Sequence, residues 1–421
     1  MKLVRLFTPA KLLAIPVLAS FVIWLIPGTG MYLRGFDERS PLEAGGVLLL
    51  GGWYVICLLV VIFAGAAGRA VPPTAGMKAA ETDPRFEVRF YMVLTVIAAA
   101  GVLGAYYTIS RVVAIIPAIQ TGQANNLSAV LLEGSSIGTL RYAVIVAAPL
   151  GAFLAMQKKS SWIMAGLNIV LLMAVVLLSS RLSLIMATAI FIYLYVHNKP
   201  ETRLRLVPTI TVAGVMFVLL GIANYTRNAG FYRLFGVENP AMMNVYQIAA
   251  YVGSPTQVAV GVARAIFNGR LDVPVDLGAG AQAIVPTFLQ TTKGNRAAVT
   301  DKGLYGQQVD IAPNLNSNSS FADTYARYGW WGMILTLLVL ALAAFLFSHF
   351  AQYTSVLVVG AGALGYGFLE YWRAFLFNTG NLVFIMIAIL VAAAIARATT
   401  TPSMHRQLSS RGSQAMKKRL S

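Results

Sequence analysis

Residues 45–67 carry the sequence GGVLLLGGWYVICLLVVIFAGAA, which contains no charged residue. In helical conformation about 20 apolar residues cross the hydrocarbon core of a bilayer. A backbone surrounded by hydrocarbon must satisfy its own hydrogen bonds, and a helix does so within one segment. This stretch therefore predicts a membrane-spanning helix.

Similar apolar runs recur along the chain, in which 58% of the residues are hydrophobic and only 11% are charged. This composition predicts an all-α polytopic membrane protein with about ten transmembrane helices. The predicted spans lie near residues 11–28, 45–67, 90–109, 140–157, 162–179, 182–197, 206–224, 331–349, 354–371 and 374–396.

The formal net charge of +17 is explained by membrane orientation. With both termini inside, the inner segments hold most of the lysines and arginines and few of the acidic residues, as the positive-inside rule requires. The basic residues form no single stripe, which argues against nucleic acid as a partner. The bilayer itself is the partner that composition implies.

The stretch from Ala241 to Phe267 is apolar but interrupted by polar residues and Pro255. Counting it as a span would place the basic tail outside, so we expect an interfacial or partly buried helix pair in an outer loop. The predicted organisation is a transmembrane bundle over 1–224, a large extracytoplasmic loop over 225–330, transmembrane helices over 331–396 and a basic cytoplasmic tail over 397–421.

Three arginines lie at predicted outer membrane boundaries. Arg181 follows two serines in a tight turn, and Arg227 and Arg233 flank the start of the large loop, where Tyr232 adds an aromatic ring. The planar guanidinium pairs bidentately with phosphate oxygens, so these residues are candidates for binding a diphosphate. The alternative is contact with lipid headgroups.

The end of the loop, residues 314–332, crowds amide and hydroxyl groups just before a span. Such groups recognise sugar hydroxyls. Ser320 and Asp323 have the spacing of a capping box, which predicts a helix start and offers a structural role for Asp323. An Asp323–Arg327 ion pair is a second structural alternative. The candidate sugar-binding or secondary residues are Tyr232, Asn318, Ser320, Tyr325, Arg327 and Arg373.

Carboxylates at the predicted outer face are candidate general bases, with Asp323 favoured first and Glu370 second. Glu370 can instead form an ion pair with Arg373 at helical spacing. Cys57 is the single cysteine, and no cluster of metal-ligating residues or nucleotide-binding motif is present. We therefore expect neither a metal nor a cofactor.

The tight turn at residues 180–183, the arginines that open the large loop and the sequence NSSFADTYARYGWWG at 318–332 resemble the O-antigen polymerase (Wzy-type) family. The resemblance covers residues 140–396 and implies a GT-C-like glycosyltransferase of the bacterial inner membrane. Its active site would face the periplasm and polymerise glycans linked to undecaprenyl diphosphate. A polysaccharide chain-length regulator is a further candidate partner.

Two alternatives stay open. O-antigen ligases have a similar topology, but an important histidine lies near the end of their large loop, whereas the histidines here (His197, His349 and His405) lie on or near the predicted inner face. A lipid-linked oligosaccharide flippase would also be apolar and basic. Such a transporter usually shows internal repeats or charges at mid-membrane, and neither is evident here.

Overall fold

The structure is a computed structural model that describes residues 3–26, 35–36, 38–81, 83–120, 137–178, 181–202, 206–272, 309, 311, 315 and 319–400. No strand occurs in these residues, which confirms the all-α prediction for this part of the chain. The helices, in order, are η1 (Leu3–Leu6), α1 (Pro9–Leu25), α3 (Ala44–Ala70), α4 (Ala75–Glu81), α5 (Pro84–Ser110), α6 (Ile115–Gln120), η2 (Ile137–Ala143), α8 (Val144–Met156), α9 (Trp162–Leu178), α10 (Arg181–Asn198), α11 (Leu206–Leu234), α12 (Pro240–Phe267), α15 (Ser320–Phe350), η4 (Val356–Val358), α16 (Val359–Leu369), η5 (Leu376–Asn378) and α17 (Gly380–Thr400).

Each predicted span coincides with a helix, but the helices differ in length. Within the described residues, five are long and apolar enough to cross a membrane: Ala44–Ala70, Pro84–Ser110, Gly138–Met156, Gly329–Phe350 and Gly380–Thr400. Pro9–Leu25, Trp162–Leu178, Leu182–Asn198 and Val356–Leu369 are shorter apolar helices. The chain is thus a helical membrane protein, and the number of ten spans stays a prediction.

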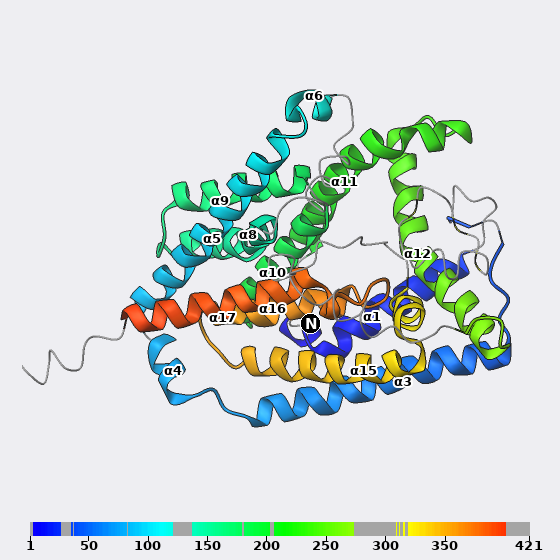
Figure 1. Ribbon diagram of the computed structural model, residues 1–421, viewed down its shortest axis with the longest axis horizontal. Helices are drawn as coiled ribbons and strands as arrows, with labels where there is room; N and C mark the ends of the chain where they lie inside the picture. Colours follow the sequence, from blue (N-terminus) through cyan, green and yellow to red (C-terminus); the bar gives the residue numbers. More distant parts are fainter. Residues whose placement is uncertain are drawn as a thin grey trace, which may run out of the picture.

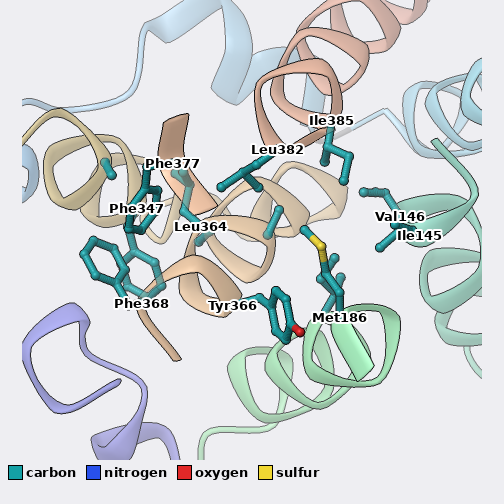
Figure 2. Close-up of a cluster of buried hydrophobic side chains, with 14 of the residues drawn as sticks. Ile145, Val146, Met186, Phe347, Leu364, Tyr366, Phe368, Phe377, Leu382 and Ile385 are labelled. Carbon is teal, nitrogen blue, oxygen red and sulfur yellow. The ribbon is translucent and has the colours of Figure 1, made fainter. Parts of the chain in front are cut away.

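α3 and α15 pack side by side along much of their length. In Figure 1, α3, α15 and α17 run along the long axis of the molecule. α15 approaches α3 closely because Gly68 faces the backbone of Phe345, where a Cβ would clash. Close backbone contact at small residues is the usual way in which membrane helices associate. Figure 2 shows the apolar core beside this pair, where side chains of α8, α10, α15, α16 and α17 meet.

α12 crosses one end of this bundle (Figure 1). The Gln257 side chain accepts hydrogen bonds from the Trp24 indole at 2.8 Å and the Ser40 backbone at 2.9 Å, and donates to the Glu38 carbonyl at 2.7 Å. These bonds hold α12 against the end of α1 and the chain just before α3. The expected helix pair is wrong, because Pro240–Phe267 is one helix that continues through Pro255.

α15 changes direction at Gly329, whose backbone has φ 56° and ψ −153°. Glycine adopts this combination readily, whereas other residues avoid it. The kink separates a first segment, in which residues 320–322, 324 and 325 are buried, from the apolar span that follows. The first segment is held inside the protein by Phe321, which is fully buried and whose ring lies 6.4 Å from that of Trp53 on α3.

Candidate functional site

The start of α10 lies level with the end of α16. Gly362 packs against the backbone of Ile190, and Met186 lies beside Tyr366 in Figure 2. The two helices are therefore antiparallel, and the same register places residues 181–182 at the level of Glu370. The backbone of Arg181 lies at the same end of the bundle as Glu370, although its side chain lies outside the described part of the structure.

Glu370 and Arg373 form an ion pair just beyond α16, with side chains only 9% and 12% exposed. This pair confirms the structural alternative offered by their helical spacing. The Tyr366 hydroxyl donates to the other Glu370 oxygen at 2.8 Å, and the Arg373 guanidinium donates to the Tyr251 hydroxyl on α12. Both carboxylate oxygens of Glu370 are thus engaged, and Arg373 links the turn after α16 to α12.

The surroundings of Arg373 keep it charged. Burial by itself lowers the pKa of Arg373, but the adjacent Glu370 carboxylate outweighs this effect, and the net pKa is raised. The hydroxyls of Tyr251 and Tyr366 act in the same direction as Glu370. A fixed, permanently charged guanidinium with a defined orientation is suited to an anionic oxygen.

A group of hydroxyls lies next to this ion pair. The ring of Tyr371 lies 6.3 Å from that of Tyr54 on α3, and its hydroxyl lies 3.1 Å from the Cys57 sulfur. The hydroxyls of Ser319 and Ser320 lie beside that of Tyr54. The start of α15 and the turn after α16 are therefore joined through α3, which places the predicted residues Ser320 and Glu370 in one region.

Asp323 lies one helical turn beyond these serines and is half-buried. Residues three and four positions apart share one helix face, so Asp323 lies on the face of Ser319 and Ser320. The predicted capping box is wrong: Ser319 is the N-cap, makes no side-chain capping bond, and accepts from the Asp323 backbone N–H at 2.8 Å through its carbonyl. The helix begins at Ser320, one residue earlier than a capping box on Ser320 requires, and the Ser320 hydroxyl is buried without a hydrogen-bond partner among the described residues.

The end of α11 approaches the same region through α12. Tyr232 is buried, and its hydroxyl donates to Gln247 at 3.0 Å, one turn of α12 before Tyr251. Arg233 is exposed and donates to the Tyr225 hydroxyl at 2.7 Å. Helical structure continues to Leu234, beyond the predicted end of this span near residue 224.

The remaining predicted residues fall into two groups. Tyr325 is buried, and its hydroxyl donates to the Leu271 carbonyl at 3.3 Å. Asn318 and the side chains of Arg227 and Arg327 lie outside the described part of the structure, so the Asp323–Arg327 pair stays a prediction.

Tyr54, Tyr251 and Tyr366 are site residues that the sequence reasoning missed. Tyr366 precedes Glu370 by four positions, a helical spacing that could have indicated contact. Tyr54 lies in an uninterrupted apolar run and Tyr251 in a weakly patterned segment, so neither carries a local signal. The partner of Tyr54 is Tyr371 and that of Tyr251 is Arg373, each more than 100 positions away in the chain.

The two described histidines lie at the opposite end of the bundle. His197 at the end of α10 contacts the Tyr353 carbonyl at 3.1 Å, and His349 at the end of α15 contacts that of Val71 at 3.2 Å. Among the described residues, no group of three or more His, Cys, Asp or Glu side chains can hold a metal ion.

Comparison of the chain with protein-family models, with characterised proteins and with solved structures finds no match.

Proposed function

We propose that this protein is a membrane glycosyltransferase, an oligosaccharide repeat-unit polymerase whose substrates are glycans linked to undecaprenyl diphosphate. The proposed location is a bacterial inner membrane, with both termini in the cytoplasm and the site facing the periplasm. One observation carries the proposal. At one end of the bundle, the oriented Arg373 cation lies in the same region as a hydroxyl-rich segment that bears the half-buried Asp323.

The proposed reaction is a displacement at an anomeric carbon. The acceptor hydroxyl oxygen forms the new bond, and the bond from the anomeric carbon to the diphosphate oxygen breaks with its electron pair leaving on the lipid diphosphate. The acceptor proton passes to the carboxylate of Asp323, our candidate general base. Fixed cations offset the charge that develops on the leaving group, the role we assign to Arg181, Arg227 and Arg233, with Arg373 as a further contributor.

Hydroxyl and aromatic groups would position the sugars. Candidates are Ser320 and Asn318 at the start of α15, followed by Tyr325 and Arg327 on the same segment, with Tyr232 approaching from α11. A hydroxyl can both donate and accept, which suits the mixed requirements of sugar hydroxyls. The position of His197 and His349 at the other end of the bundle supports a polymerase over a ligase that depends on a histidine.

Two experiments separate the candidate functions. Deletion of the gene should leave single repeat units on lipid A core, seen by gel. Loss of all repeat units from the core would instead indicate a ligase. In liposomes, the purified protein should elongate lipid-linked repeat units into a ladder. Movement of the lipid across the bilayer without elongation would indicate a flippase.

The matched variants in that assay are Arg181→Ala, Arg181→Lys and Arg39→Gln. We expect Arg181→Ala to abolish the ladder at normal protein level and Arg181→Lys to restore it only partly, because lysine lacks the planar fork. Arg39 donates to the Leu25 carbonyl at 2.9 Å and is not among the residues assigned to the site, so Arg39→Gln should elongate normally. Full elongation by Arg181→Ala would refute the proposed role of Arg181.

A further inference from the structure

Arg141 is a buried arginine at the start of a candidate membrane span. It lies in η2, directly before α8, and only 7% of its surface is exposed. η2 is held tightly against α5, since a Cβ at Gly101 would clash with the backbone of Leu140 and Arg141. Gly101 lies nine residues before the end of α5, a rise of roughly 14 Å along a helix, so Arg141 is set well inside the bundle.

The guanidinium of Arg141 is only partly satisfied. It donates to the Gly138 carbonyl at 2.7 Å and to the Tyr142 hydroxyl at 3.0 Å, and it lies 4.6 Å from the centre of the Tyr142 ring. Its Nε atom is buried and has no acceptor. Among the described residues, no carboxylate lies within ion-pair distance of it.

This environment differs from those of Arg373 and Arg264, which each lie beside a carboxylate. Arg373 is paired with Glu370, and Arg264 lies 3.4 Å from a Glu43 oxygen. An arginine cannot release its proton, so burial cannot neutralise it. Charged side chains within membrane segments are rare and are usually paired or functional. Two neutral acceptors and one ring are poor compensation for a complete charge.

The position of Arg141 indicates which end of the bundle would receive a ligand. α8 and α17 both run antiparallel to α5, because Gly151 lies against Tyr91 and Arg89 donates to the Thr399 carbonyl. Figure 2 shows Val146 of α8 beside Ile385 of α17. Arg141 therefore lies level with the first turn of α17, at the end of the bundle that carries Arg373.

We infer that Arg141 binds the phosphate group of a membrane lipid. The planar fork of Arg141 and the adjacent Tyr142 hydroxyl match phosphate oxygens, and the buried Nε has no acceptor within the described part of the protein. Two sources share this chemistry: the diphosphate of an undecaprenyl carrier and an ordinary anionic phospholipid. In the first case the inference deepens the proposed function and rests on it, whereas in the second it stands alone.

The test measures lipid binding, without glycan transfer, so it does not depend on polymerase activity. Purified full-length protein in a neutral detergent is titrated with undecaprenyl diphosphate, with dioleoyl phosphatidylglycerol and with dioleoylglycerol, which has no phosphate. We expect Arg141→Gln to weaken binding of a phosphate lipid by roughly 10- to 100-fold and Arg141→Lys to weaken it less. Arg264→Gln, whose arginine is already paired with Glu43, should bind as the unmodified protein does.

A thermal-unfolding measurement separates binding from a structural role. Without lipid, Arg141→Gln should unfold at the same or a higher temperature, because it removes a buried charge and leaves no carboxylate behind. A structural arginine predicts lower unfolding temperature and unchanged affinity, which would overturn the inference. If Arg141→Gln does not fold, the affinity of Arg141→Lys decides, and binding equal to that of the unmodified protein would likewise overturn it.

The lipids whose binding is weakened by Arg141→Gln show which kind of lipid supplies the phosphate group. A loss confined to undecaprenyl diphosphate supports the carrier as ligand, and a parallel loss for phosphatidylglycerol supports a general phospholipid site. Equal binding of dioleoylglycerol and the phosphate lipids by the unmodified protein would contradict phosphate recognition altogether.

Discussion

At the scale of single residues, the two candidate carboxylates occupy different environments. Glu370 has both oxygens engaged, one by Arg373 and one by the Tyr366 hydroxyl, inside a mostly buried cluster. Asp323 is half-buried on the helix face that carries Ser319 and Ser320. Glu370 is therefore suited to orienting Arg373, and Asp323 stays our candidate general base.

The first prediction separates these two roles with isosteric amides. Asp323→Asn should fold normally but elongate the glycan on the order of 10²- to 10⁴-fold more slowly, because an amide cannot act as a general base. Glu370→Gln should retain more activity per folded molecule but lose about 3–5 kcal/mol of stability, because it leaves the buried Arg373 charge without its partner. Elongation rates and thermal unfolding of both variants check this.

Near-normal elongation by Asp323→Asn would return this residue to a structural role. If the rate defect appeared instead in Glu370→Gln, with no change in its unfolding temperature, Glu370 would become the better candidate base.

At the scale of elements, the kink at Gly329 sets the direction of the segment that carries Ser320 and Asp323. The segment is anchored by Phe321 against Trp53, and the span after the kink is anchored by the contact of Gly68 with Phe345. These two anchors can hold together only if the chain turns between them. The backbone conformation of Gly329 supplies that turn.

The second prediction follows from this conformation. Gly329→Ala should lose about 1–3 kcal/mol of stability and reduce elongation, because a residue with a Cβ is strained there and relaxation would displace residues 320–328. Gly166→Ala in α9 is the matched control: a Cβ at Gly166 meets open space, and alanine favours a helix by up to about 1 kcal/mol. Thermal unfolding of both variants would show opposite shifts, and equal shifts would contradict the role of the kink.

At the scale of the whole molecule, the bundle separates its functional groups between two ends. Arg141, Arg373 and the backbone of Arg181 lie at one end, where α12 also crosses, and His197 and His349 lie at the other. The proposed chemistry at the first end depends on arginines, whose charge persists at any physiological pH.

The third prediction is therefore that elongation is independent of divalent metal ions. The purified protein should keep its activity in excess EDTA, because guanidinium groups supply the charge stabilisation that a metal would otherwise provide. The measurement is ladder formation with and without the chelator, using a known magnesium-dependent glycosyltransferase as a control. Complete loss of activity that magnesium or manganese restores would contradict an arginine-based mechanism.

The amino-acid sequence by itself determined the helical membrane class and the approximate position of a helix at each predicted span. Runs such as 45–67 are apolar over a length that matches a bilayer, and their backbones can satisfy hydrogen bonds only as helices. It also determined local pairs such as Glu370 with Arg373, since residues three positions apart meet on a helix. These features depend on neighbours in the chain.

Only the tertiary structure decided which residues share a site. Tyr54 meets Tyr371, and Tyr251 meets Arg373, across more than 100 positions, through packing that no local pattern encodes. In the packed bundle Ser320 forms no capping box, α12 is one helix, and Arg141 is buried without a described carboxylate. Burial and long-range partners are properties of the packed bundle, because each is set by which helix faces come together.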